Sequence, residues 1–393
     1  SNSGNVQIGY QGAGGGEIDL LAAHNLGLTT NATSTMVRVG NGGTGTSGAV
    51  QGDISIQADA IDLSANATQT SIIIGNAGAG GVTGEINITA NGALTLTQTA
   101  INSETVIGNG DLDVSTTGAV GGNVTVTAGS VAMTGNVSAQ ANIGNRGVGT
   151  VSGNLDIETT NGDLSLTAQN RGLAAIGNRV GAVDGANLVT GSASGDIIVG
   201  STGKLTITAN DSGQARIATG FAANSTIQVN ADGDISLAVN GTPAQAGDGS
   251  PLPGQALIGN FGNGLAATIG GDITVTSAHG KIDLDVEENG GYIGVGNIGG
   301  TTSTTGNVSV SALDGSGGGI SLTANAGVAT GNSITLDATI QIGNAAGSGA
   351  VSGGVTVSSD GVISLLSEGA SSIVQIGDTG VGGGAIDILA NGT

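Results

Sequence analysis

The sequence predicts an all-β fold, a right-handed parallel β-helix of about eleven three-stranded coils, and three observations lead to this class. A short Ile/Val-Gly-Asn marker recurs along the whole chain, at intervals from 31 residues (Ile8 to Val39) to 47 residues (Val295 to Ile342). Between markers, apolar residues alternate with Thr, Ser and Asn, as in half-buried strands. Glycine, with 78 of 393 residues, is too frequent for helices. A sustained period in this range is the signature of a solenoid.

Each module is expected to hold three strands joined by turns. The clearest example has apolar residues at every second position of Asp272–Ser277, Lys281–Val286 and Tyr292–Gly296. Three short strands of this kind close one coil, and successive coils stack about 4.8 Å apart. Eleven coils would therefore form a rod on the order of 50 Å long.

The marker itself is expected to form a corner. Ile143 and Asn145 share parity, so both should point inward, and Gly144 should supply a positive φ or a close backbone approach. An inward asparagine in every coil can hydrogen-bond to its neighbours above and below and to buried turn backbone. A ligand-binding role is less favoured, because a ligand site is seldom copied into every coil. The predicted ladder consists of Asn41, Asn76, Asn109, Asn145, Asn178, Asn260, Asn297 and Asn344.

Degenerate markers and irregular segments complete the organisation of the chain. Ile8-Gly9-Tyr10, Ile217-Ala218-Thr219 and Ile376-Gly377-Asp378 depart from the pattern, and residues 173–255 are less regular than residues 105–172. The segment 240–255 contains all three prolines and is expected to leave the sheet as a protruding loop. We expect one continuous domain over residues 1–393.

The two ends of the chain show no capping element. The first expected strand is Val6–Ile8 and the last is Ala385–Leu389. Uncapped β-helix ends template further strands. We therefore expect a fragment of a longer chain or a filament subunit, stacked end to end with further coils of the same or neighbouring chains.

Composition restricts the partners. The formal charge is −22, from 29 acidic and 7 basic residues, which argues against nucleic acid or an anionic membrane surface as a partner. There is no cysteine, and Tyr and Phe number only two each, as a solenoid without a large central core allows. No apolar run approaches the roughly 18 residues of a membrane span.

The strongest candidate for catalysis is an acidic cluster, and we expect it to be a solvated strand face rather than an active site. Polysaccharide-active β-helices need clustered acids with Arg or Lys on one face. Here Asp283 and Asp285 share a face with Lys281, followed by Glu287 and Glu288, but the neighbouring coils offer only Ser236 and Ser321. His24 and His279, the only histidines, lie many coils apart. The sequence therefore predicts no enzyme and no catalytic residue.

Two other ligand hypotheses are weaker. Only Gly108-Asn109-Gly110-Asp111-Leu112-Asp113 approaches a calcium-binding nonapeptide, so we expect no cofactor, with structural calcium at loops such as Asp314-Gly315-Ser316 as the less favoured alternative. Threonine pairs such as Thr95/Thr97 and Thr125/Thr127 suit an ice-binding face. They fall on different strands of the module, however, and the β-propensity of threonine explains them more simply.

The repeat units resemble a known group. GNVTVTAGSVAMTG, GDLSLTAQN and GGDITVTSAHGKIDLDV are similar to the haemagglutinin-type β-helix repeats of large secreted bacterial adhesins, namely filamentous-haemagglutinin-like exoproteins of two-partner secretion and autotransporter passengers. The longer period and the Ile-Gly-Asn corner depart from that group. The resemblance implies an extracellular shaft or fibre on the bacterial surface. The alternative is an adhesin module that binds host or neighbouring-cell glycans or proteins through projecting loops such as 240–255.

Overall fold

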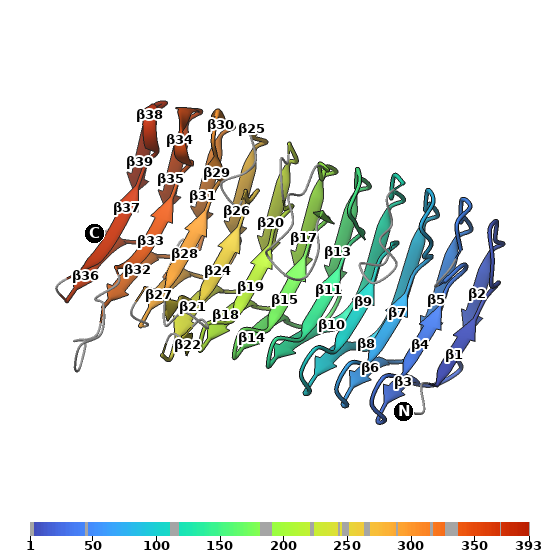
Figure 1. Cartoon of the computed structure of the whole chain (residues 1–393). Coiled ribbons are helices and arrows are strands. Elements are labelled where there is room, and N and C mark those ends of the chain that lie inside the picture. Colours follow the sequence, from blue (N-terminus) through green and yellow to red (C-terminus); the bar gives the residue numbers. More distant parts are fainter. Residues whose placement is uncertain are drawn as a thin grey trace.

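The computed structural model stacks the chain coil upon coil along one axis (Figure 1). It describes residues 4–43, 46–110, 118–180, 191–220, 224–242, 244–245, 251–262, 268–287, 290–314, 317–326, 337–369 and 371–392. Three parallel sheets run the length of the rod, which confirms the predicted all-β parallel β-helix. None of the described residues forms a helix long and apolar enough to cross a membrane.

The marker strands form one sheet, called here the marker sheet. Each strand pairs in parallel with the marker strand of the next coil, so that Ile143 lies opposite Ile107 on one side and Ile176 on the other. The eleven strands confirm the eleven predicted coils. In spatial order they are β1 (Asn5–Ile8), β4 (Met36–Val39), β7 (Ser71–Ile74), β9 (Glu104–Ile107), β11 (Gln140–Ile143), β15 (Leu173–Ile176), β19 (Gln214–Ile217), β24 (Gln255–Ile258), β28 (Tyr292–Val295), β33 (Ala338–Ile342) and β37 (Ser372–Ile376).

The other two sheets take the remaining strands of each coil, and two long strands bend from one sheet into the other: β8 (Ile86–Gln98) and β10 (Val124–Asn136). The first sheet continues with β2 (Ile18–Leu21), β5 (Ile54–Ala58), β13 (Leu155–Thr159), β17 (Ile197–Ser201), β20 (Ile227–Ala231), β26 (Ile273–Ser277), β31 (Val308–Ala312), β35 (Val355–Ser359) and β39 (Ile386–Ala390). The second sheet continues with β3 (Leu26–Thr30), β6 (Ile61–Ala65), β14 (Leu164–Gln169), β18 (Leu205–Asn210), β21 (Ile235–Asn240), β27 (Ile282–Val286), β32 (Ile320–Asn325) and β36 (Ile363–Glu368).

The core is a column of aliphatic side chains. Strands of all three sheets send every second residue inward, as the alternation predicts. On β27, for example, Ile282 and Leu284 are buried while Asp283 between them faces outward. Val, Ile, Leu and Ala stacked on their equivalents in the next coil fill the interior without aromatic residues.

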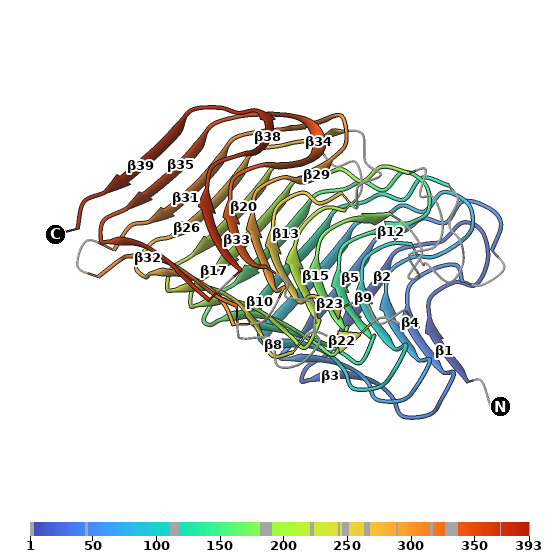
Figure 2. The same cartoon turned by 60° about the vertical axis from the view of Figure 1, so that its left-hand side comes forward.

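A fourth side of the coil was not predicted. After each marker, the chain makes a glycine-rich corner segment that bulges outward before the next strand of the first sheet (Figure 2). Successive corner segments are joined by single parallel bridges between Val50, Val82, Val120, Val151 and Ala193. Four of these residues form a second buried apolar cluster with Val180. One valine or alanine per module could have predicted this buried side, but it lies in a glycine-rich stretch without alternation of apolar and polar residues.

Short strands also occur in the corner segments. They are β12 (Arg146–Gly147), β16 (Arg179–Val180), β25 (Thr268–Ile269), β29 (Ile298–Gly300), β30 (Ser303–Thr305), β34 (Ala345–Ser352) and β38 (Thr379–Gly382).

The corner segments cover much of the outer face of the marker sheet. Val106 and Asn142 alternate away from the aliphatic column, and yet both are fully buried.

The proline-containing segment breaks the parallel pattern. Between β21 and β24, β22 (Ala244–Gln245) pairs antiparallel with β23 (Pro251–Leu252), whereas the other described strand pairs are parallel. Residues 243 and 246–250 of the predicted loop lie outside the described residues. The chain therefore leaves the three sheets here in a hairpin before it resumes at Gln255.

Candidate functional sites: the asparagine corner and the arginine row

The corner needs glycine for both of the reasons that the sequence suggested. Gly144 has a φ of 139°, a conformation that side chains disfavour. A Cβ atom at this position would also lie 2.3 Å from the carbonyl oxygen of Gly177 in the next coil. At Gly108 the corresponding distance to the oxygen of Gly144 is 2.0 Å. Successive corners thus pack backbone against backbone.

The asparagine after this glycine ties together two coils. Asn145 is fully buried, and its Oδ1 accepts a hydrogen bond of 2.9 Å from the backbone N–H of Asn109. Its Nδ2 donates to the carbonyl oxygens of Gly122, in the preceding corner segment, and Ser152, in its own, both at 2.7 Å. One side chain therefore satisfies three buried backbone groups, which confirms the predicted inward orientation and its role in the turn.

The same arrangement recurs along the rod, although the ladder is mostly not one of side chain to side chain. The Oδ1 atoms of Asn41, Asn76, Asn109, Asn178 and Asn344 accept from the backbone N–H of the residue at the preceding corner, at 2.9–3.2 Å. Direct amide-to-amide bonds join only Asn260 to Asn297 and Asn297 to Asn344 in the described ladder. Asp378, in a degenerate marker, extends it by accepting from the N–H of Asn344 at 2.8 Å.

The ladder is interrupted at Thr219. This residue is fully buried, and within the described part of the chain its Oγ1 has no hydrogen-bond partner, nor does Oδ1 of Asn260 in the next coil. The preceding residue is Ala218, which does not adopt the positive φ of the marker glycines. The backbone hydrogen bonds of the corner nevertheless continue through Ile217-Ala218-Thr219, as from Ala218 N–H to the oxygen of Ile176. What is missing is a side-chain amide at position 219 that accepts from Asn178.

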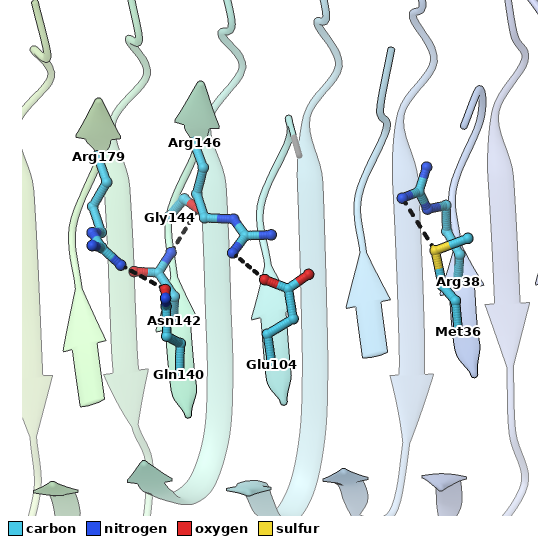
Figure 3. A network of polar contacts seen from close by, with 8 residues as sticks. All are labelled: Met36, Arg38, Glu104, Gln140, Asn142, Gly144, Arg146 and Arg179. Atoms are coloured by element: carbon cyan, nitrogen blue, oxygen red, sulfur yellow. Dashed lines mark hydrogen bonds and ion pairs between the residues drawn. The ribbon is translucent and has the colours of Figure 1, made fainter. Parts of the chain in front are cut away.

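A second group of polar residues lies on the outer side of the marker sheet and at the start of the corner segments, and Figure 3 shows Arg38, Arg146 and Arg179 of this group. Four of the five arginines of the chain belong to it, and we call them the arginine row: Arg38, Arg146, Arg179 and Arg216. Arg38 and Arg146 are fully buried, and the other two are partly buried. Sequence reasoning missed this row. The available signal was the repeated choice of arginine beside the marker in a chain with only seven basic residues.

Arg146 forms a buried ion pair with Glu104, a residue of the adjacent coil. Its Nη1 lies 2.7 Å from Oε2 of Glu104, with the two side chains 0% and 12% exposed. Burial acts to raise the pKa of Glu104. The charge of Arg146 and hydrogen bonds from Arg146 and Ser71 outweigh this effect, so the pKa is lowered. The pair therefore links β9 to the corner segment that follows β11.

Arg179 and Arg216 contact neutral acceptors instead. Nη1 of Arg179 donates to Oε1 of Gln140 at 2.9 Å, and Nη2 of Arg216 donates to Oε1 of Gln214 and, at 3.4 Å, of Gln255. The Arg216 guanidinium also lies 4.8 Å from the centre of the Phe261 ring. Burial lowers the pKa of Arg179 to about 9, with further contributions from Arg216 and Arg146, and burial lowers that of Arg216 to about 10.

The acidic cluster lies as the sequence placed it. Asp283 forms an ion pair with Lys281 on the same face, and its register neighbours are Ser236 and Ser321. Burial raises the pKa of Asp285, and the charges of Glu287 and Asp283 raise it further. Glu288 lies outside the described residues.

The histidines and the calcium candidates do not form a metal centre in the described chain. His24 and His279 each approach one aspartate, Asp59 at 3.6 Å and Asp232 at 3.2 Å. Among the described residues no group of three or more His, Cys, Asp and Glu side chains could hold a metal ion. Residues 111–113 and 315–316 of the two predicted calcium segments lie outside them.

The threonine pairs are divided between two sheets. Thr125/Thr127 and Thr274/Thr276 lie in the first sheet, and Thr95/Thr97 and Thr206/Thr208 in the second. One rank in the second sheet spans four coils in register, namely Thr97, Thr134, Thr167 and Thr208.

Comparison with known proteins gave no relative. No protein-family model matches the chain, and neither does any curated protein or any solved structure. What the fold establishes is therefore the class, an all-β parallel β-helix with an asparagine ladder.

Proposed function

We propose that this chain is a structural segment of an extracellular shaft or fibre on a bacterial surface. The observation that carries the proposal is the register. All eleven marker strands stack in one unbroken parallel sheet, and buried asparagines link most of the corners. Tension along the axis of such a rod is shared by the backbone hydrogen bonds of three sheets and by the corner amides. The resemblance of the repeat units to secreted adhesins supports the same role, as does the lack of cysteine.

Surface labelling tests this proposal. Antibodies raised against the rod should label intact cells that make the protein, and electron microscopy of the surface material should show thin unbranched fibres with a rise of about 4.8 Å per coil. Labelling that requires permeabilised cells would refute the extracellular role.

The enzyme alternative has its own assay. Purified protein is expected to leave polysaccharides uncleaved. Cleavage that is lost in D283N/D285N would replace the structural proposal with an enzymatic one, because these carboxylates form the best acidic cluster of the described chain.

End-to-end stacking with further coils, of this chain or of neighbouring copies, belongs to the same proposal.

A second candidate function is recognition of glycans or proteins on host or neighbouring cells through the hairpin of β22 and β23. Its antiparallel pairing sets it apart from the stacked sheets, and projecting loops are where binding usually resides. Deletion of residues 242–253 should leave the circular dichroism spectrum unchanged and abolish adhesion. Unchanged adhesion would reduce the hairpin to an insertion.

A further inference from the structure

The arginines of the row differ in whether a carboxylate neutralises their charge. Arg146 faces Glu104, but in the described chain no carboxylate forms an ion pair with Arg179 or Arg216. Their hydrogen-bond acceptors are glutamine amides, which neutralise no charge. The register neighbours of Arg216 on the marker sheet are Ala175 and Leu257, both buried and apolar.

This arrangement is costly without a counter-charge. A guanidinium that is partly removed from water loses part of its solvation, and an anion beside it would compensate for this loss. The two charges also act on each other, since Arg216 contributes to lowering the pKa of Arg179. The described carboxylate whose charge acts on Arg179 is Glu104, and its ion pair is with Arg146.

We propose that Arg179 and Arg216, with the glutamines that contact them, form a seat for one small tetrahedral oxyanion of the phosphate or sulfate class. The two arginines lie on adjacent coils, one following β15 and the other on β19. Guanidinium groups present paired N–H donors that match the oxygens of such an anion.

The surroundings fit this ligand. Nε of Arg216 is buried and has no hydrogen-bond partner in the described chain, which leaves a donor for an anion oxygen. Gln140 and Gln214 accept from the arginines through Oε1 and therefore keep their Nε2 groups as additional donors. Because both arginines are only partly buried, solvent ions can reach them.

The site also lies beside the corner at which the asparagine ladder is interrupted. Arg216 is two residues from Ala218, and the ladder is interrupted at Thr219. A bound anion would link the coils of β15 and β19, on the outer face, at the point where no asparagine links them on the inner side.

Equilibrium dialysis with radiolabelled inorganic phosphate, at constant ionic strength in chloride, tests the proposal. The wild-type chain should bind about one phosphate with a dissociation constant on the order of 1 mM. R179M/R216M should bind at least about tenfold more weakly. K204M/K281M is the matched control: it removes the same two charges from exposed lysines paired with Asp234 and Asp283, and its affinity should equal that of the wild type.

Several results would overturn the proposal. One is the absence of saturable phosphate binding by the wild type. Another is an equal loss of binding in the lysine control, which would indicate an adventitious ion only. If circular dichroism shows R179M/R216M to be unfolded, R179M and R216M alone take its place, each with the same expected weakening, and unchanged affinity in both refutes the site.

Discussion

Two neighbouring stretches of the rod form the same corner with different residues and different hydrogen bonds. Between Glu104 and Asn178, glycine and asparagine occupy every marker, each amide is fully used, and Arg146 has a carboxylate partner. Between Arg216 and Asn260, alanine and threonine replace the pair, two buried oxygens lack partners in the described chain, and Arg216 contacts only neutral groups. The backbone hydrogen bonds of the corner continue through Ala218 and Thr219, so the loss is that of the side-chain amide and of its three backbone partners. Every ladder asparagine follows a glycine of positive φ, and we therefore expect glycine and asparagine to act as a unit.

The largest expected effect is the loss of an intact corner amide. N145A leaves the N–H of Asn109 and the carbonyls of Gly122 and Ser152 without their partner, at about 1–3 kcal/mol for each buried group. We expect a total destabilisation on the order of 4 kcal/mol, measured as the shift in urea-induced unfolding. T219V is the matched change in the broken corner: it keeps the buried methyl groups, removes only a hydroxyl that has no partner in the described chain, and should destabilise by less than about 0.5 kcal/mol. Equal effects of the two variants would contradict the comparison.

Removal of the carboxylate that balances Arg146 should come next. E104Q removes the carboxylate from the buried ion pair with Arg146 and should cost about 3 kcal/mol at pH 7. The folded-state pKa of Glu104 is lowered from 4.5, so its stabilisation is present above pH 4.5 and is lost as the pH falls through the lower folded-state value. The difference in urea midpoint between wild type and E104Q should therefore shrink from pH 7 to pH 3.

A surface glutamate provides the control for this experiment. Glu158 on β13 is exposed, and E158Q changes the net charge by the same amount. Its midpoint should stay within about 0.5 kcal/mol of the wild type at pH 7. A comparable loss in E158Q would show that overall charge, rather than the buried pair, sets the effect.

The sequence predicted the parts of the structure that repeat with simple parity. Inward Ile143 and Asn145 follow from alternation, and the need for Gly144 follows from the corner. The structure of the corner segments could not be predicted, because Val82 and Val120 are isolated among glycines and show no alternation of apolar and polar residues. The arginine row escaped for a related reason. Outward parity on a strand normally means solvent, and only the corner segments turn the outer position of Asn142 into a buried one.

Repair of the broken corner should give a smaller gain. A218G/T219N restores both residues of the marker, so that the new Oδ1 can accept from the N–H of Asn178 and the new Nδ2 can bind turn carbonyls. Each net hydrogen bond contributes about 1 kcal/mol, and we expect a stabilisation of about 1–2 kcal/mol in urea unfolding. T219N alone should give a smaller gain, because every ladder asparagine follows a glycine of positive φ and Ala218 does not adopt that conformation. A gain in T219N equal to that of the double variant would show that the two residues act independently.

The smallest expected effect concerns a turn at which the regular stretch has the less favourable residue for the backbone conformation. The residue after Asn136, Gln169 and Asn210, which stand in register, has a φ of 51° at Val137, 49° at Asn170 and 47° at Asp211. A β-branched residue is an outlier in this left-handed region, whereas Asn and Asp tolerate it. V137N should therefore stabilise the chain by about 0.5–1 kcal/mol in urea unfolding, since it relieves backbone strain without altering the core.

The reverse exchange one coil further on tests whether strain is the cause. N170V places valine at a φ of 49° and should destabilise by a similar amount, plus the loss of one exposed hydrogen bond from Asn170 to Asn136. Because Val137 lies two coils from Ala218 and shares no partner with it, V137N should add to A218G/T219N within about 0.5 kcal/mol. Stabilisation by both V137N and N170V would instead mean that side-chain contacts, and not the left-handed backbone, determine the choice of residue at this turn.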